Sequence, residues 1–237
     1  LFAIAMNDAV RGAISELIEG HFIFVYDADG REEETDFMVL ARLATPEHVR
    51  TMRKEGGGLI FLMVHHDVCE RFGLPFTTQL YASARNDYPV LQALDPNDIP
   101  YDAKSSFSLT LNHRKTFTGI TDVDRALTIR RFGELAAETV DKPREALGLL
   151  GKEFRSPGHV AVCRSSASPL KYRFGHTELG TALAVMAGET AVVAGCEMMG
   201  DSGKSLSRKD AKAYAERNGF GFLDGREIVE AWRNWSE

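Results

Sequence analysis

Six short apolar runs constrain the fold most, because each has the length and composition of a buried strand. Longer segments with apolar residues at helical spacing separate these runs. Strands and helices that alternate without an internal repeat favour helices packed on both faces of one sheet. We therefore expect an α+β fold, a single three-layer domain over residues 1–237 with a mixed twisted sheet between helical layers. The expected strands are 22–26, 59–64, 107–111, 160–163, 191–196 and 220–223.

Capping residues set the expected helix boundaries. Asn7 and Gly20 flank an amphipathic segment, and Thr45 precedes Pro46 at the start of a second helix that should run to about Lys54. The other expected helices are 65–72, 123–138 opened by Asp122, one after Pro143, 177–186 begun by Thr177, one ending near Asn218 after a capping box of Ser207 and Asp210, and a last one ending near Trp235.

Residues 74–104 form the longest stretch without a helical or strand pattern. The stretch is rich in Pro, Asp and Asn, which favour irregular structure. We interpret it as a long excursion over the surface, of the kind that often serves as a lid or an interface loop.

Composition disfavours several classes of function. A net charge of −6 over 237 residues argues against a general nucleic-acid surface, and no apolar run reaches membrane-spanning length. The cysteines Cys69, Cys163 and Cys196 lack CxxC spacing, which is typical of reduced thiols rather than a disulfide framework. No signal peptide is visible. We expect a cytoplasmic protein without a nucleic-acid or membrane partner.

The densest polar segment directly follows the strand at 22–26. Residues 27–36 contain six carboxylates and one Arg. Carboxylates crowded at a strand end repel one another unless a cation or bound protons relieve them, and oxygen-rich clusters suit Mg²⁺. Arg31 suits a phosphate or a carboxylate. On composition alone, an acidic surface loop explains the segment equally well.

A second polar cluster covers residues 173–178. Gly175 allows the backbone close to a ligand, and the first amides of a helix beginning at Thr177 can hold an anion beside Arg173. His176 and Glu178 can ligate a metal or relay a proton. The alternative is an ordinary helix start with a solvated Glu. A joint metal and phosphate site would explain this cluster and the acidic segment together.

Three further residues are candidates from their positions. His159 follows Pro157 and Gly158 and should be held rigidly, and Glu197 ends an apolar strand, where partial burial would raise its pKa and suit acid/base work. Thr118 stands in a polar turn and can line a phosphate. Ordinary surface or turn positions explain all three as well. Common nucleotide-binding, hydrolase and zinc-protease motifs are absent from the sequence.

Taken in order, these clusters resemble 3,4-dihydroxy-2-butanone 4-phosphate synthase, an enzyme family of riboflavin biosynthesis, and the resemblance covers most of the chain. The acidic segment, which has no insertion, is similar to that of the archaeal branch. The residues that carry the resemblance are Asp27, Asp29, Arg31, Glu32, Glu34, Asp36, Thr118, Gly119, Ile120, Thr121, Asp124, Arg125, Ala126, Pro157, Gly158, His159, Arg173, Gly175, His176, Thr177, Glu178 and Glu197.

The resemblance implies conversion of D-ribulose 5-phosphate into L-3,4-dihydroxy-2-butanone 4-phosphate and formate by a homodimer, with Mg²⁺ or Mn²⁺ and active sites near the subunit interface. It implies that Glu32 and His176 hold the metal and also contact the substrate. The residues implied to be catalytic are Asp27, Glu34, His159 and Glu197. The others implied to contact the substrate are Arg31, Asp36, Thr118, Arg173, Phe174, Gly175 and Thr177.

Two positions depart from the family pattern. Phe61 stands where family members often carry a cysteine, and Ser156 stands where an Arg usually precedes the Pro-Gly-His segment. A non-catalytic homologue that retains a sugar-phosphate and metal site is therefore an alternative function. A nucleotide- or RNA-binding relative is a third, which the net charge disfavours.

Overall fold

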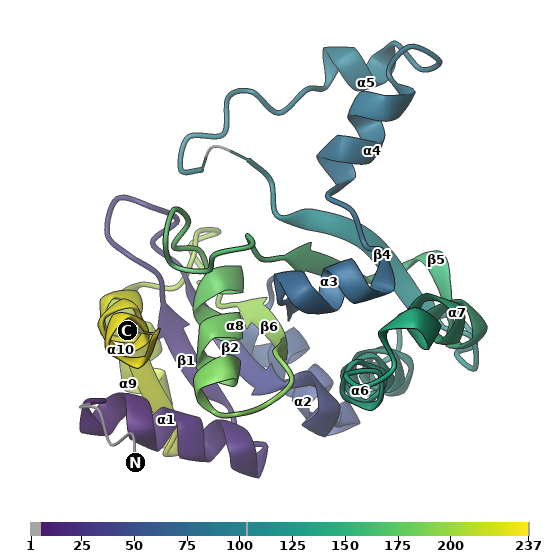
Figure 1. The fold of residues 1–237 in the computed structure, drawn as a ribbon. Coiled ribbons are helices and arrows are strands. Elements are labelled where there is room, and N and C mark those ends of the chain that lie inside the picture. The colour runs from purple at the N-terminus through teal and green to yellow at the C-terminus, as the bar shows by residue number, and fades with distance from the viewer. Residues whose placement is uncertain (1–5, 103, 237) are drawn as a thin grey trace.

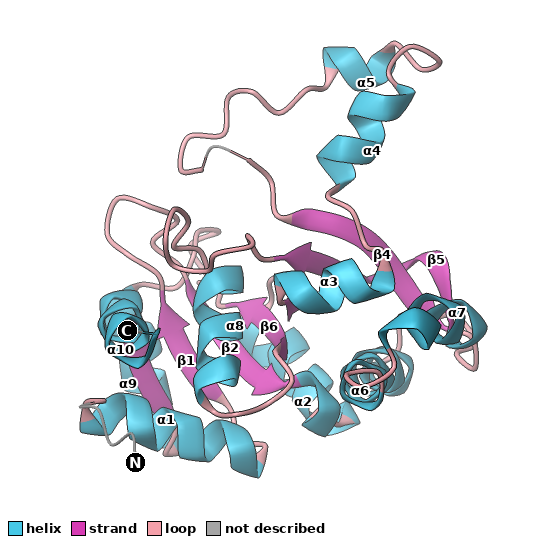
Figure 2. Ribbon diagram, in the orientation of Figure 1, coloured by secondary structure: helices cyan, strands magenta, loops and turns pink. Residues whose placement is uncertain are grey.

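A seven-stranded mixed sheet lies between two layers of helices in the computed structural model, which describes residues 6–102 and 104–236 (Figures 1 and 2). The order across the sheet is β4-β5-β3-β6-β2-β1-β7, with parallel pairing only between β1 and β7 and between β3 and β5 among the described strands. The α+β prediction is thereby confirmed. The strands are β1 (Ile23–Tyr26), β2 (Thr35–Leu40), β3 (Phe61–Val64), β4 (Phe107–His113), β5 (Phe154–Arg164), β6 (Val192–Glu197) and β7 (Gly221–Asp224).

Most helices begin and end where the capping residues predict. The Asn7 side chain accepts a hydrogen bond from the Val10 amide, and Gly20 ends the first helix with φ +82°. The second helix is shorter than expected and continues as a π-helical turn, Met52–Gly56. The α-helices are α1 (Asp8–Glu19), α2 (Pro46–Thr51), α3 (His66–Phe72), α4 (Thr77–Ala84), α5 (Val90–Ala93), α6 (Asp122–Glu138), α7 (Pro143–Glu153), α8 (His176–Met186), α9 (Arg208–Asn218) and α10 (Gly225–Ser236).

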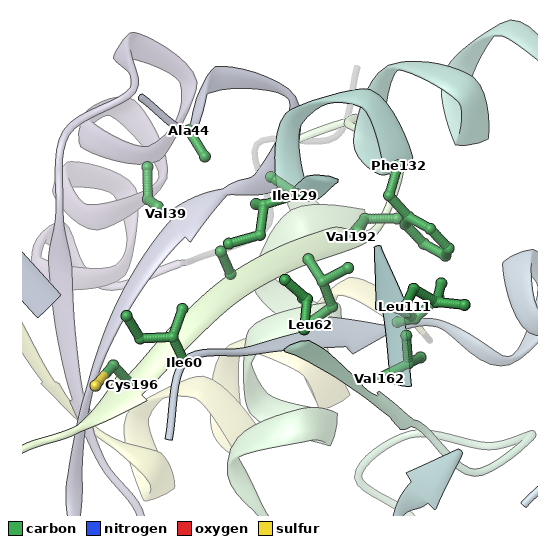
Figure 3. Close-up of a cluster of buried hydrophobic side chains, with 14 of the residues drawn as sticks. Val39, Ala44, Ile60, Leu62, Leu111, Ile129, Phe132, Val162, Val192 and Cys196 are labelled. Carbon is green, nitrogen blue, oxygen red and sulfur yellow. The ribbon is translucent and has the colours of Figure 1, made fainter. Parts of the chain in front are cut away.

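Each face of the sheet carries its own hydrophobic core. Because side chains alternate along a strand, Phe24 and Phe37 face one core while Ile23 and Met38 face the other. The first core packs against α2, α3, α6, α7 and α9, and Figure 3 shows Leu62 of β3 at its centre, among side chains of neighbouring strands and of α6. The second core packs against α1, α8 and α10. Both cores hold the strand ends, and with them the polar clusters, in fixed positions.

Three sequence predictions were wrong in detail. Residues 74–104 are not wholly irregular, because they contain α4 and α5, which project beyond the rest of the ribbon in Figure 1. Residues 156–159 lie inside β5 rather than before it. Thr121, rather than Asp122, caps α6, since its side chain accepts a hydrogen bond from the Asp124 amide.

One strand was missed altogether. β2 begins inside the acidic segment, at Thr35 and Asp36, and all six of its residues are buried. Two buried polar residues at the start of a strand do not give the apolar pattern by which the other strands are recognised.

The described helices include none that is long and apolar enough to cross a membrane.

Candidate functional site

A cavity of about 340 Å³ lies where the acidic segment, the start of α8 and the ends of several strands meet. Its lining includes most of the predicted site residues: Arg31, Glu32, Glu34, Asp36, Arg173, Gly175, His176, Thr177 and Glu197. A larger cavity of about 910 Å³, between α3, α8 and α10, contains none of them. The convergence of buried carboxylates with a histidine makes the smaller cavity the candidate active site.

Asp27 organises the acidic segment from within. Its buried carboxylate accepts hydrogen bonds from the amides of Glu32 and Glu34, at 3.0 and 3.1 Å, and from Nη1 of Arg31 at 3.1 Å. The tight turn between these residues uses Gly30, at φ +80°. Asp27 therefore sets the direction in which the side chains of this segment point, and it does not itself line the cavity.

Arg31 approaches the backbone at the start of α8. A Cβ atom placed on Gly175 would lie 2.5 Å from Nη2 of Arg31, so only glycine leaves room for the guanidinium there. From the sequence, Gly175 was expected to let the backbone lie close to a ligand. In the structure, an arginine of the same chain lies in that space. Nη1 of Arg31 also donates to Oε2 of Glu32 at 2.7 Å.

His176 stands between two carboxylates. Its Nδ1 lies 3.2 Å from Oε2 of Glu32, and its Nε2 lies 3.6 Å from Oδ1 of Asp36. Within the part of the chain that the structure describes, neither oxygen of the fully buried Asp36 has a hydrogen-bond partner, and Nε2 of His176 has none either. Asp27, Glu32 and His176 each offer a ligand atom, and these atoms lie within 4.8 Å of one another. Carboxylate and imidazole groups left without partners fit a divalent cation.

The electrostatics of this group follow from burial and close charges. Burial favours protonated Glu32, but the His176 hydrogen bond and Arg31 lower the pKa of the Glu32 carboxyl below its ordinary range. Burial alone would lower the pKa of His176, but Asp36 and Glu32 raise it to about 9. Burial raises the pKa of Asp36 well above its ordinary value. Strongly shifted groups in a cavity are typical of functional sites.

Glu34 and Glu197 supply two more carboxyls on the same side of the cavity. Glu197 lies opposite Asp36 in the antiparallel pair of β2 and β6, and its Oε2 accepts the Leu59 amide at 2.7 Å. Burial raises the pKa of Glu197. Burial and the neighbouring Glu197 raise the pKa of Glu34. Carboxyls whose pKa moves towards neutrality can both donate and accept protons.

The segment before α8 contributes a positive charge to the cavity wall, at Arg173. Nε and Nη2 of Arg173 donate to Oδ2 of Asp102 at 3.1 and 2.6 Å. Thr177 lines the cavity from the first turn of α8. Phe174 is partly exposed and is not among the lining residues. Glu178 is buried and is not among the lining residues, and its Oε1 lies 4.0 Å from Nη1 of Arg173.

His159 and Thr118 do not line this cavity. His159 lies exposed in β5, on the same face as Cys163, which does line it. At about 3.3 Å per residue the two are about 13 Å apart along the strand. The His159 amide donates to Oδ1 of Asn112 at 2.8 Å, and Nδ2 of Asn112 lies 3.4 Å from the Thr118 carbonyl oxygen. These two candidates therefore form a separate polar cluster within the chain.

Several lining residues could not be recognised from the sequence. Phe61, noted only as a departure from the family pattern, lines the cavity from β3. Tyr101 and Asp102 come from the far end of the segment that was interpreted as irregular, and the Tyr101 ring centroid lies 5.6 Å from the Arg31 guanidinium carbon. The acidic composition of 95–102 was the available signal, but it does not say which residues reach the cavity.

Comparison with known proteins identifies the family. A family model described as 3,4-dihydroxy-2-butanone 4-phosphate synthase matches residues 11–231. The chain belongs to this family. Archaeal members of that name are close in sequence: the Methanothermobacter thermautotrophicus enzyme is 48% identical over 224 residues (94% of this chain, 95% of the relative), and the Archaeoglobus fulgidus enzyme is 46% identical over 221 residues (92% of each).

The fold agrees with solved structures of 3,4-dihydroxy-2-butanone 4-phosphate synthases. One, in complex with two magnesium ions, has a TM-score of 0.74 and 25% identity over 95% of this chain and 96% of that one. The resemblance predicted from the sequence, including its archaeal type, is confirmed. The chain is an enzyme, a lyase of riboflavin biosynthesis.

Proposed function

We propose that this chain converts D-ribulose 5-phosphate into L-3,4-dihydroxy-2-butanone 4-phosphate and formate with the help of a divalent metal ion. The observation that carries the proposal is the 3.2 Å approach of Glu32 to His176, with Asp36 on the other side of the imidazole. These residues come from the acidic segment, β2 and α8, and they meet in one cavity.

Glu32 and His176 would hold the metal. Mg²⁺ suits the oxygen-rich lining, and Mn²⁺ tolerates the imidazole better. The complex of a related synthase with two magnesium ions supports this assignment. A divalent ion bound there would polarise the ketone of the substrate and acidify the neighbouring hydroxyl and C–H groups.

Arg31 and Arg173 would bind the substrate phosphate. Both guanidiniums face the cavity, and the first turn of α8, at Thr177, adds the partial positive charge of a helix N-terminus. A phosphate held there would place the sugar chain alongside the carboxyls of Glu34 and Asp36.

Glu34 and Glu197 would move protons at the carbon and oxygen atoms next to the ketone. Their raised pKa makes each a better proton acceptor than an ordinary carboxylate, which suits removal of a proton from carbon and its return to oxygen. The Leu59 amide fixes one oxygen of Glu197, which leaves the other for the substrate. Asp27 would act on this chemistry by positioning Glu32 and Glu34.

His159 would act in the cavity of a second copy of the chain. It is exposed, and it is not among the described residues that line the cavity of its own chain. Apolar side chains near its polar cluster are also exposed: Phe117 to 94%, Ile120 to 49% and Val123 to 64%. Exposed apolar side chains beside a reactive histidine favour a homodimer whose active sites are completed across the interface.

A cytoplasmic location belongs to the same proposal. Cys69, Cys163 and Cys196 are free and buried, which fits a reducing compartment.

Formate release tests the proposed reaction. Purified protein is incubated with D-ribulose 5-phosphate and Mg²⁺ at neutral pH, and formate is measured by a coupled dehydrogenase or by NMR. We expect one formate for each ketose consumed and no turnover in the presence of a chelator. A folded dimer that releases no formate would refute the reaction.

Phe61 is the observation behind the alternative stated from the sequence, a non-catalytic homologue that binds sugar phosphates, which the family membership of the chain disfavours. Its ring is part of the cavity wall and 6% exposed, so it takes up room beside the carboxyls. Calorimetry separates the two candidates, because the non-catalytic homologue would bind ribulose 5-phosphate and Mg²⁺ without forming formate.

A further inference from the structure

One carboxylate bridges the two arginines of the cavity. Oδ2 of Asp102 accepts hydrogen bonds from Nη2 of Arg173 at 2.6 Å, from Nε of Arg173 at 3.1 Å and from Nη2 of Arg31 at 3.4 Å. The side chains of all three residues are largely buried, with 11% exposure for Asp102 and 15% for each arginine. A single anionic oxygen thus sits between two guanidiniums, as an oxygen of a bound phosphate would.

Asp102 accepts hydrogen bonds from arginine N–H groups that face the cavity. Nη1 of Arg31 already donates to Asp27 and Glu32, so its Nη2 is the group left for an incoming anion. Arg173 uses Nε and Nη2 for Asp102, and Nη2 also donates to the backbone oxygen of Lys104 at 2.8 Å. An anion that takes over the N–H groups now bound by Asp102 must therefore displace its carboxylate from both arginines.

The charge balance leads to the same requirement. Asp27, Glu32 and Glu178 also lie within 4.0 Å of these guanidiniums, so Asp102 is the fourth carboxyl group beside the two arginines. A phosphate dianion next to the arginines would be repelled by the Asp102 carboxylate if that carboxylate stayed in place. Of the four carboxylates, Asp102 alone contacts both arginines among the described residues.

We propose that Asp102 determines ligand specificity as an internal competitor for the phosphate subsite formed by Arg31 and Arg173. The carboxylate holds both arginines in place in the free protein and must be displaced, so weak anions do not bind and a phosphate ester does. This inference rests on the proposed function, in which the two arginines bind the substrate phosphate. Its ligand class is a phosphate monoester or inorganic phosphate.

Calorimetry with inorganic phosphate tests the inference without turnover. Wild-type protein, Asp102→Asn and Asp98→Asn are titrated in metal-free buffer at neutral pH. Asn keeps the size of the side chain and removes the competing charge, so we expect Asp102→Asn to bind phosphate about tenfold or more tightly than wild type. Asp98 is exposed and lies in the same segment, so Asp98→Asn removes an equal charge away from the arginines.

Two further results decide the interpretation. Adding Arg173→Ala to Asp102→Asn should abolish the gain, because the gain requires the arginine. An unchanged or weaker phosphate affinity in Asp102→Asn, an equal gain in Asp98→Asn, or a gain that survives Arg173→Ala would each overturn the inference. Formate release is measured separately: its absence refutes the proposed reaction, whereas unchanged phosphate affinity in an active enzyme refutes only the role of Asp102.

Discussion

Nδ1 of His176 lies 3.2 Å from Oε2 of Glu32, although 144 positions separate the two residues in the chain. The contact joins the segment after β1 to the first residue of α8. Asp27 supports the contact, because its carboxylate accepts a hydrogen bond from the Glu32 amide. The spacing between the two groups is therefore a property of the folded sheet and its loops, and a cation that bridges them needs no large rearrangement.

Replacement of Glu32 by Gln tests this pair. The amide keeps the size and one acceptor oxygen but loses the charge that a divalent ion requires, so we expect metal-dependent formate release to fall by about 10²-fold or more. Turnover is measured across a Mg²⁺ titration, and thermal unfolding checks that the fold is retained.

Glu33→Gln is the matched control for that experiment. Glu33 is the next residue, is exposed, and accepts the Gly30 amide through Oε1, which Gln also provides. We expect this variant to turn over like wild type. Equal losses in both variants would mean that the segment needs overall negative charge rather than a ligand at position 32.

Mixed dimers test whether His159 acts across a subunit interface. His159→Ala and Glu32→Gln are each expected to be nearly inactive. In His159→Ala the turnover rate should fall by about 10²-fold, because an acid/base group is lost. Mixing the two by reversible unfolding gives heterodimers in which one site contains both changes and the other contains neither. Activity should recover to about a quarter of wild type, because about half the dimers then carry one intact site. Mixtures no more active than their components would place His159 outside the shared site.

Local patterns predicted those parts of the fold that local interactions determine. The apolar run at 22–26 became β1, and Asn7 and Gly20 cap α1 as expected. β2 was missed because Thr35 and Asp36 are buried polar residues at its start. The cavity needs a carboxyl group at position 36, and this functional requirement places a polar residue where the strand pattern would have an apolar one.

β5 shows a second physical reason for error. Pro157 and Gly158 predict a break, yet both lie within the strand. The pairing of β3 with β5 begins at Ala161, so the earlier part of β5 pairs with β4 only and is an edge, where Pro removes no needed hydrogen bond. Such long-range pairing determines which strand ends lie next to one another. For this reason the sequence could group the acidic segment with residues 173–178, but it could not separate His159 and Thr118 from them or add Asp102.

Substitution of Gly175 by Ala should weaken substrate binding and leave the fold intact. The new Cβ would lie 2.5 Å from Nη2 of Arg31, and the flexible guanidinium can move away. Loss of one charge-assisted hydrogen bond to phosphate is worth about 1.5–3 kcal/mol, so we expect KM to rise about tenfold or more with a smaller change in kcat. Gly148→Ala is the control, because its Cβ would meet no atom of the described residues within 4 Å. An unchanged KM in Gly175→Ala would show that Arg31 does not bind the substrate.

The contribution of His48 to the free energy of unfolding should fall as the pH drops below the ordinary histidine value of 6.5. Burial, with a smaller contribution from His21, lowers the pKa of His48. Its Nδ1 accepts the Thr45 amide at 3.2 Å, and the Thr45 side chain accepts the His48 amide in return, which forms the capping box of α2. Protonation would turn this acceptor into a donor and break the box. The half-buried His65 and the buried His113 also have lowered pKa values, so they act in the same direction.

His48→Gln isolates this contribution. Between the lowered pKa of the folded state and 6.5, the unfolded chain binds more protons than the folded one, so the free energy of unfolding rises with pH by at most about 1.4 kcal/mol per pH unit for one proton. Gln is the usual partner of Thr in a capping box and does not titrate. Urea unfolding at pH 7.5, 6.0 and 5.0 (about the range of histidine titration) should therefore show a shallower loss of stability in His48→Gln than in wild type. Parallel pH profiles for the two proteins would show that His48 is not kept neutral by the fold.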